Sequence, residues 1–279
     1  MPKIDPLPDY ARLFDLSGKS AIVTGAGGIL GRHFSAALAA HGAAVALVDI
    51  DGASVDALAC ELGRRHSAPM VAIQCDLSDP HAIEEMVQSA AKALGGIDIV
   101  HNNAVTKGDS LEAMFEAAES YAPETWRQHM AVNLDGAFHV MKSAGAFMLE
   151  QDRGGSIIST ASIYGLLGAD ERIYEGSDYM GVQINTPPSY AAAKAGLIGL
   201  TRYFAARWGP AGIRVNAIAP GGVESGQNDV FAERYGARVP MGRMARSGEI
   251  VGAVVWLASD AASYVTGQVI SVDGGLTAW

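Results

Sequence analysis

Short runs of β-branched and other apolar residues alternate along this chain with longer, alanine-rich stretches whose apolar residues recur at helical spacing. The short runs have the length of buried strands. The sequence predicts seven of them, at Ser20–Thr24, Ala44–Asp49, Met70–Cys75, Ile97–His101, Ser156–Thr160, Arg214–Ile218 and Val269–Val272. Strands that are separated by helices pair in parallel, because the intervening helix returns the chain to the same end of the sheet. We therefore expect an α/β fold built on a doubly wound, seven-stranded parallel sheet.

The stretches between these runs are long enough for helices that cover both faces of such a sheet. The sequence predicts helices at Leu30–His41, Ala53–Arg65, Pro80–Leu94, Glu124–Glu150 (two helices or one bent helix), Ser189–Trp208 and Gly248–Ser259. Neither a repeat nor a linker separates them. We expect residues 1–279 to form a single domain, with residues 1–18 as a lead-in on its surface.

Two polar stretches interrupt the alternation, at Thr106–Pro123 and Gly165–Pro188. Each follows a predicted strand, at the edge of a parallel sheet where ligands bind. We expect both to form walls of a substrate pocket, with residues 165–188 as an inserted substrate loop. The alternative is a surface loop that takes no part in binding.

Composition and charge argue against several partners. The 279 residues carry a formal net charge of −10 and the pI is about 5.1, without a Lys/Arg cluster that would attract nucleic acid. Cys60 and Cys75 have no Cys or His neighbour at the spacing of metal ligands, so we predict reduced thiols and no metal. No apolar run is long enough to span a membrane and no signal segment begins the chain, so we expect no membrane partner and a cytoplasmic location.

A glycine-rich turn, Thr24-Gly-Ala-Gly-Gly-Ile-Leu-Gly31, connects the first predicted strand to the first predicted helix. Glycines let the backbone approach a pyrophosphate closely, and the start of the helix offers N–H groups and a positive dipole end to the anion. This is the context of a dinucleotide-binding turn in a Rossmann fold. A tight connection without a ligand would also use glycine.

Asp49, at the end of the second predicted strand, favours the dinucleotide interpretation. A carboxylate there accepts hydrogen bonds from the adenosine ribose hydroxyls and repels a 2′-phosphate. No arginine follows in Ile50-Asp51-Gly52 to reverse this preference, so the sequence predicts NAD rather than NADP. The alternative for Asp49 is a solvated acid in a turn.

Tyr190 and Lys194 lie four residues apart in Ser189-Tyr-Ala-Ala-Ala-Lys, so on a helix both side chains leave the same face. An ammonium beside a phenol favours the phenolate, so Lys194 is expected to lower the pKa of Tyr190 and make it a proton acceptor nearer neutrality. Taken alone, the same spacing is also that of an amphipathic helix with a snorkelling lysine.

Further motifs occur in order along the chain, among them Asp76-Leu77, Asn102-Asn103-Ala104 and Pro220-Gly221. Together with the glycine-rich turn and the Tyr190/Lys194 pair, they resemble the short-chain dehydrogenase/reductase family from about Leu16 to Gly275. The resemblance implies a catalytic tetrad of Asn133, Ser162, Tyr190 and Lys194. Ser159 is expected to lie inside the strand. The implied cofactor contacts are Gly25, Gly28, Ile29, Leu30 and Gly31 of the turn, Asp49, Asp76, Leu77, Asn103, Ala104, Tyr190, Lys194, Pro220, Gly221, Val223 and Ser225. The final segment, Val265–Gly275, is similar to the family's last strand and implies a homotetramer.

The chain departs from the family pattern at several positions. Ile29 occupies the place of the penultimate glycine of the turn, which puts the details of phosphate binding in question. Val105 follows Asn102-Asn103-Ala104 at a position where the family has glycine, and Ser225 stands where the family often has threonine. An insertion between Leu166 and Pro188 separates Ser162 from Tyr190 more widely than usual, so it must loop out if both residues are to meet one substrate.

The resemblance implies reversible hydride transfer between NAD and a secondary alcohol or ketone. Tyr190 would exchange the hydroxyl proton, Ser162 would bind the substrate oxygen, Lys194 would hold the nicotinamide ribose, and Asn133 would order a relay water near Lys194. The polar insertion favours a sugar, sugar acid or polyol as the substrate. The alternatives are a 3-oxoacyl-thioester reductase and a noncatalytic NAD-binding protein on the same fold.

Overall fold

The predicted sheet is present in the computed structural model, which describes residues 9–279. Its strands are β1 (Ser20–Thr24), β2 (Ala44–Asp49), β3 (Met70–Gln74), β4 (Ile99–Asn102), β5 (Gly155–Thr160), β8 (Ile213–Pro220) and β9 (Val269–Val272). All neighbours pair in parallel, in the order β3-β2-β1-β4-β5-β8-β9. The order runs outward in both directions from β1 and β4, so the carboxyl ends of these two strands flank the crevice where such sheets bind ligands. The α/β doubly wound fold class is confirmed.

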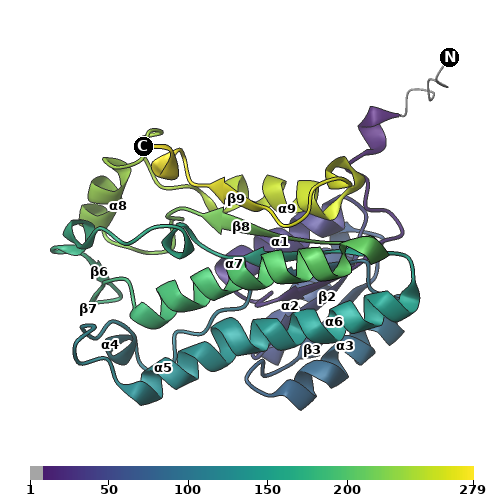
Figure 1. Ribbon diagram of the computed structural model, residues 1–279, viewed down its shortest axis with the longest axis horizontal. Coiled ribbons are helices and arrows are strands. Elements are labelled where there is room, and N and C mark those ends of the chain that lie inside the picture. Colours follow the sequence, from purple (N-terminus) through teal and green to yellow (C-terminus); the bar gives the residue numbers. More distant parts are fainter. Residues whose placement is uncertain (1–8) are drawn as a thin grey trace.

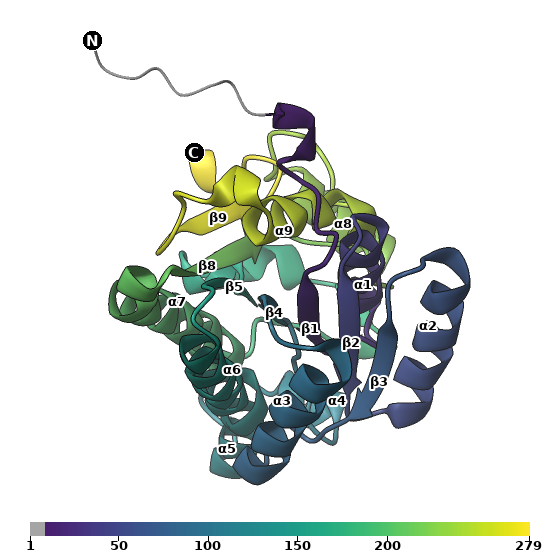
Figure 2. The same ribbon diagram turned by 90° about the vertical axis from the view of Figure 1, so that its right-hand side faces the viewer.

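Helices cover both faces of the sheet, as Figures 1 and 2 show. One face carries α1 (Ile29–Ala40), α2 (Gly52–Arg65) and α9 (Val251–Ala258), and the other carries α3 (Pro80–Leu94), α6 (Ala137–Gln151) and α7 (Pro188–Trp208). The predicted helix over 124–150 consists of α5 (Pro123–Met130) and α6, joined by a π-helical segment at Ala131–Gly136. A Cβ on Gly136 would lie 2.4 Å from the carbonyl oxygen of Leu77, so this position requires glycine.

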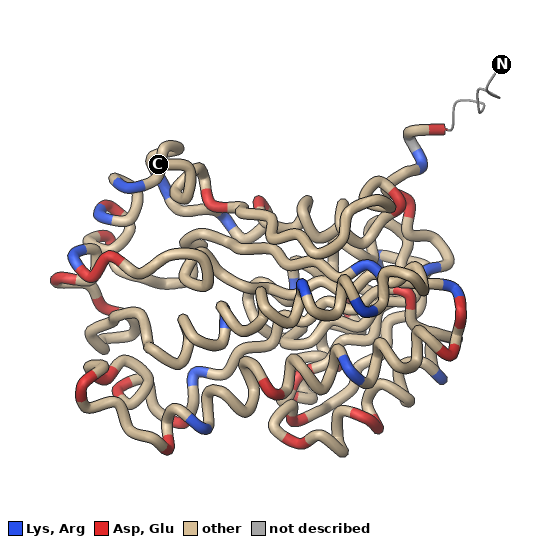
Figure 3. The backbone as a smooth tube through the Cα atoms, viewed as in Figure 1, with Lys and Arg blue, Asp and Glu red and all other residues tan. Residues whose placement is uncertain are grey.

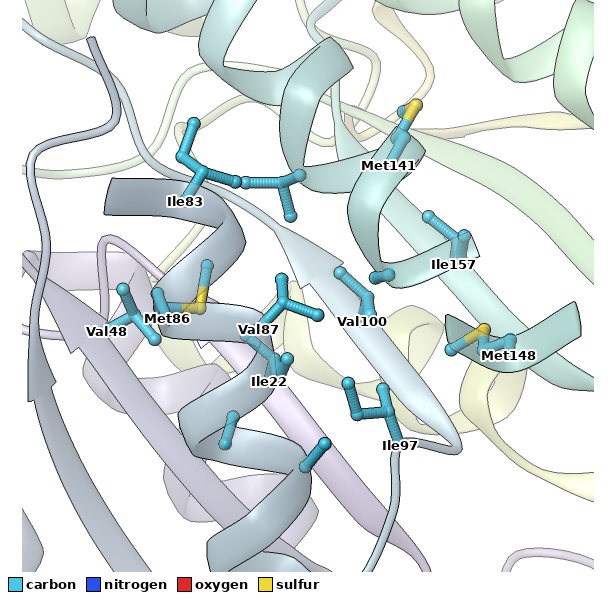
Figure 4. Close-up of a cluster of buried hydrophobic side chains, with 14 of the residues drawn as sticks. Ile22, Val48, Ile83, Met86, Val87, Ile97, Val100, Met141, Met148 and Ile157 are labelled. Carbon is cyan, nitrogen blue, oxygen red and sulfur yellow. The ribbon is translucent and has the colours of Figure 1, made fainter. Parts of the chain in front are cut away.

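Two apolar layers, one on each face of the sheet, hold the helices in place. In one layer, shown in Figure 4, Ile22 and Val100 of the sheet lie against Met86 and Val87 of α3. In the other, Val23 of β1 packs with residues of α1, α2 and α9. Strands buried on both faces need apolar side chains at successive positions, which explains why the strands read as continuous apolar runs in the sequence.

The polar stretch at 165–188 is a layer of its own at the carboxyl end of the sheet. It contains a short hairpin, β6 (Asp178–Tyr179) with β7 (Val182–Gln183), and lies against α4 (Leu111–Met114) and α8 (Asp229–Gly236) at one end of the molecule (Figure 1). Neither of these helices nor the hairpin was predicted, because each is too short to show a period in the sequence. Aromatic and aliphatic side chains, among them Ile173, Tyr174 and Phe231, form a third apolar cluster beneath this layer.

Ion pairs join the insertion to α8 and to the residues that follow it. Asp170 pairs with Arg172 at 2.7 Å and with Arg238, and Glu175 pairs with Arg234 of α8 at 3.2 Å. Figure 3 shows acidic and basic positions mixed at the end of the molecule that carries α8. The pairs with Arg234 and Arg238 fasten the insertion to this end.

The lead-in is anchored to the domain, although it was expected to lie only on its surface. Residues 1–8 fall outside the described residues; of the rest, Tyr10 and Phe14 are exposed while Leu16 is completely buried. The backbone N–H of Leu16 donates a hydrogen bond to the carbonyl of His41, 2.8 Å away. The lead-in therefore ends in the core beside α1.

Gly145 of α6 lies against the indole of Trp208, at the end of α7. A Cβ at this position would be 2.3 Å from the Trp208 ring, so Gly145→Ala is expected to reduce the free energy of unfolding by about 1–3 kcal/mol. Gly199→Ala on α7 is the matched control: no atom lies within 4 Å of its Cβ, and alanine there should stabilise by up to about 1 kcal/mol. Urea unfolding at one protein concentration measures both. Equal effects of the two substitutions would contradict this packing.

Candidate active site

The glycine-rich turn closes tightly over the carboxyl end of β1. Gly25 has a φ of +66°, and a Cβ there would lie 2.7 Å from Cα of Ala104. A Cβ on Gly31 would lie 1.9 Å from the carbonyl oxygen of Gly25, so helix α1 can approach the turn only with glycine at this position. Gly28 is the N-cap of α1 and has no side-chain cap, which leaves the N–H groups of the first helical turn for a ligand.

Ile29, where the chain departs from the family pattern, is the first residue of α1, and half of its surface is exposed. It lines the cofactor cavity described below, so its part in phosphate binding stays a prediction.

Asp49 ties the turn to the end of β2. Its Oδ2 accepts a hydrogen bond of 2.9 Å from the backbone N–H of Gly27, and its Oδ1 accepts one of 3.1 Å from that of Asp51. Asp49 also lines the large cavity described next. It is therefore more than a solvated turn acid.

A cavity of about 530 Å³ runs along the carboxyl ends of β1, β2 and β4. Of the predicted cofactor contacts, it is lined by Gly25, Gly28, Ile29, Leu30, Gly31, Asp49, Asn103, Ala104, Tyr190, Lys194, Val223 and Ser225. A cavity of this size, lined by a helix N-terminus, a carboxylate and lysines, fits a nicotinamide dinucleotide.

Two predicted cofactor contacts, Asp76 and Leu77, line neither this cavity nor the one that adjoins it. Asp76 is exposed, and its Oδ1 accepts hydrogen bonds of 2.8 Å from both the backbone N–H and the hydroxyl of Ser78. Leu77 is buried in the core beneath α3. Neither residue lines the cavity, so their contact with a cofactor stays a prediction.

A second cavity, of about 270 Å³, adjoins the first. The two share Leu30, Thr160, Tyr190 and Val223. Ser162, together with Pro220 and Gly221 of the predicted cofactor contacts, lines only the second cavity. Tyr190 thus lies where a cofactor and a substrate would meet.

Ser162 and Tyr190 are brought together although 28 positions separate them in the chain. Ser159 is fully buried inside β5, as predicted, whereas Ser162 follows the strand and its Oγ accepts a hydrogen bond of 3.2 Å from the backbone N–H of Tyr164. Burial raises the pKa of Tyr190 above its ordinary value, and a hydrogen bond with Ser162 opposes this rise without cancelling it.

Lys194 is buried and points to the end of β5 rather than to the Tyr190 hydroxyl. Its Nζ donates a hydrogen bond of 2.6 Å to the carbonyl of Thr160 and lies 5.5 Å from the centroid of the Tyr190 ring. Burial lowers the pKa of Lys194 to about 8. The expected lowering of the Tyr190 pKa by Lys194 is therefore not present in this arrangement, in which desolvation of the phenol dominates.

Thr160, which the sequence analysis missed, connects four elements of the site. Its hydroxyl donates to Oδ1 of Asn103 at 3.2 Å and contacts Nε2 of His101 at 2.9 Å, while its carbonyl accepts from Lys194. Because the single hydroxyl proton goes to Asn103, Nε2 of His101 must carry the proton that completes this bond. The signal in the sequence was its place as the last residue of a strand whose end faces the ligand crevice.

Asn133 lies in the π-helical segment and does not line either cavity. Its Oδ1 accepts a hydrogen bond of 2.8 Å from the backbone N–H of Thr106, which holds the loop after β4. π-helical turns often occur at functional sites. The predicted water relay through Asn133 stays a prediction.

Two side chains of the polar stretches reach the cofactor cavity, and neither was singled out from the sequence. Lys107 and Tyr179 both line it, and Nζ of Lys107 donates a hydrogen bond of 2.8 Å to the Tyr179 hydroxyl. The inserted hairpin therefore borders the cofactor cavity, whereas no residue of the insertion 165–188, which was expected to wall a substrate pocket, lines the second cavity. The chain's other polar groups give no metal site: within residues 9–279, no cluster of three His, Cys, Asp or Glu could hold an ion.

Comparison with known proteins identifies the family. A sequence model described as "Enoyl-(Acyl carrier protein) reductase" matches residues 25–277. Galactitol 2-dehydrogenase (L-tagatose-forming) from Cereibacter sphaeroides is 36% identical over 280 residues, which cover 97% of this chain and 100% of that protein. A 3-oxoacyl-[acyl-carrier-protein] reductase from Thermotoga maritima is 32% identical over 265 residues, covering 94% and 98% of the two chains.

A solved structure shows the same fold with ligands. The gluconate 5-dehydrogenase from Burkholderia cenocepacia J2315, in complex with NADP and tartrate, superimposes with a TM-score of 0.84 at 28% identity and covers 96% of this chain and 98% of that one. This chain belongs to the short-chain dehydrogenase/reductase family. It is an oxidoreductase of a class that uses a nicotinamide cofactor. Among residues 9–279, none of the helices has the length and apolar character needed to span a membrane.

His101 makes the stability of this site sensitive to acid. The side chain is fully buried, and burial lowers its pKa from 6.5 to about 3, with Lys194 adding to the effect. Between these values the unfolded chain binds a proton that the folded protein does not, so stability falls as the pH falls. From about pH 7 to pH 5, the free energy of unfolding should fall by about 2 kcal/mol more in the wild type than in His101→Gln. Urea unfolding at both pH values measures this difference; parallel losses would contradict it.

Proposed function

We propose that this protein is a dehydrogenase that transfers a hydride between NAD and a secondary alcohol or ketone of a sugar, sugar acid or polyol. The observation that carries this proposal is the position of Tyr190, which lines both the cofactor-shaped cavity and the adjoining smaller cavity that contains Ser162. Galactitol and gluconate, the substrates in the names of two similar proteins, are both of this chemical class.

Each catalytic side chain has a role that follows from its surroundings. Ser162 is oriented by the backbone N–H of Tyr164 and binds the oxygen of the reacting group. Tyr190 removes the proton of the alcohol in oxidation and returns it in reduction. Lys194 uses one of its three donors on the carbonyl of Thr160, so it would have two donors left to hold the cofactor ribose and would supply positive charge beside the phenol. When bound, the nicotinamide supplies the hydride acceptor or donor.

The choice of NAD rests on Asp49. Its carboxylate lines the cofactor cavity at the end of β2, whereas Lys107 and Lys194, the lysines that line the same cavity, come from the loop after β4 and from α7. Similar proteins of known structure hold NADP, so the fold alone does not select NAD. A homotetramer in the cytoplasm remains our expectation from the family resemblance.

The two alternative functions have less support. A noncatalytic NAD-binding protein would not need Ser162 and Tyr190 beside each other at the junction of two cavities. A 3-oxoacyl-thioester reductase is represented among the similar proteins, but such reductases usually favour NADPH, against which Asp49 stands.

Tyr190→Phe is expected to reduce turnover by about 100- to 10,000-fold, because the phenol is the acid/base group that lines both cavities, while NADH binding stays within about twofold. Steady-state absorbance at the NADH band measures turnover, and quenching of protein fluorescence measures binding. Tyr203→Phe is the matched control, since Tyr203 lies on the same helix with 63% of its surface exposed. A Tyr190→Phe variant that turns over at the wild-type rate would rule out this assignment.

Asp49→Ser is expected to raise the ratio of kcat/KM for NADP to that for NAD by about tenfold or more, because it removes a charge that repels the 2′-phosphate. Asp56→Ser, an exposed position on α2 outside the cavity, is the control for the change in net charge. Initial rates with both cofactors measure the ratio. An unchanged ratio in Asp49→Ser would mean that another group selects the cofactor.

A further inference from the structure

The second cavity, of about 270 Å³, which we call the substrate-side cavity, has no charged side chain in its lining. Among the described residues, those that line it are apolar, glycine or proline, or carry a neutral hydroxyl or amide. The neutral polar groups belong to Thr160, Ser162, Tyr164, Tyr190, Gln227 and Tyr235. A carboxylate placed in such a cavity would lose its hydration without gaining an ionic partner, which is unfavourable.

Lys194 and Lys107, which line the adjoining cofactor cavity, are already engaged. Lys194 is buried and donates to the carbonyl of Thr160. The Nζ of Lys107 donates to the Tyr179 hydroxyl and lies 4.4 Å from the centroid of that ring. Of the insertion's charged residues, Asp170 pairs with Arg172 and Arg238, and Glu175 pairs with Arg234; none of these residues lines the substrate-side cavity.

The Tyr164 hydroxyl accepts a hydrogen bond and keeps its own proton. The Tyr174 hydroxyl donates to that of Tyr164 at 3.0 Å, and the Tyr174 oxygen lies 2.6 Å from Oγ1 of Thr186. Tyr174 gives its one proton to Tyr164, so Thr186 must donate to Tyr174. The Tyr164 hydroxyl is the last in this series and keeps its own proton. Tyr164 lines the substrate-side cavity next to Ser162, so this proton can be donated to a ligand there.

We propose that the substrate is a neutral molecule with at least two hydroxyl groups, one bound at Ser162 and Tyr190 and a second bound by the Tyr164 hydroxyl. This inference rests on the proposed function and narrows it to neutral polyols and their ketones, excluding sugar acids. Thr186 and Tyr174, both supplied by the insertion, are positioning residues that orient Tyr164. The apolar wall formed by Ile163, Val223 and Phe231 packs against the carbon chain of the substrate.

A panel of four- to six-carbon alditols, assayed with NAD beside the aldonates of the same carbon chains, tests the substrate class. The best alditol is expected to have a kcat/KM at least about tenfold above that of the best aldonate, since the cavity has no partner for a carboxylate. A best aldonate would overturn the inference while leaving the proposed function in place. No turnover of either series, with NADH still bound, would overturn the proposed function and the inference together.

Tyr164→Phe tests the second contact. With the best alditol, KM is expected to rise about five- to tenfold while kcat stays within about twofold, because the lost hydrogen bond acts in binding and not in proton transfer. Tyr203→Phe should change neither constant. An unchanged KM, or a fall in kcat alone, would contradict the role of Tyr164.

Tyr174→Phe provides a second variant that keeps the Tyr164 hydroxyl and removes the group that orients it. Its KM for the same alditol is expected to rise by about two- to fivefold with kcat unchanged. If Tyr164→Phe fails to fold, an unchanged KM in Tyr174→Phe overturns the proposal on its own.

Discussion

The site depends on the hydrogen bond between the buried ammonium of Lys194 and the carbonyl of Thr160, which joins the first turns of α7 to the end of β5. A buried lysine is unfavourable without such a partner, so this bond fixes where the helix can lie. From Thr160 the same network reaches β4 through His101 and Asn103, and β1 through the bond of 3.1 Å from Asn103 to the carbonyl of Thr24. The strand ends and the catalytic helix are thereby held as one unit.

Around this rigid unit the chain places parts that differ in how they are held. The glycine turn accepts no side chain at Gly25 or Gly31, because a Cβ atom at either position would overlap backbone atoms. The insertion, in contrast, is held by exposed ion pairs to α8 and by an apolar cluster. Exposed ion pairs contribute little to stability. The cofactor side is thus set by backbone geometry, and the substrate side by the packing and pairing of side chains.

Much of this arrangement could be predicted from the sequence, and the exceptions have physical causes. The buried strands and their crossover helices followed from apolar runs, and Ser162, Tyr190 and the five predicted residues of the glycine turn line the two cavities. α8 and the β6–β7 hairpin could not be predicted because long-range packing, not local periodicity, stabilises them. The sequence predicted a lowered pKa for Tyr190, whereas burial raises it. Spacing on a helix does not reveal that the Lys194 ammonium has an acceptor in the carbonyl of Thr160.

The central claim is that Tyr190 is the proton acceptor and that its ionisation depends on the cofactor beside it. Ultraviolet difference spectroscopy, with the tyrosinate band followed against pH in wild type and Tyr190→Phe, tests this directly. Without NAD, the Tyr190-dependent ionisation should lie above the ordinary tyrosine range, as burial requires. With NAD, whose nicotinamide ring is positively charged, it should move down by about one pH unit or more. The same titration with and without NAD, or no difference between the two proteins, would contradict the account.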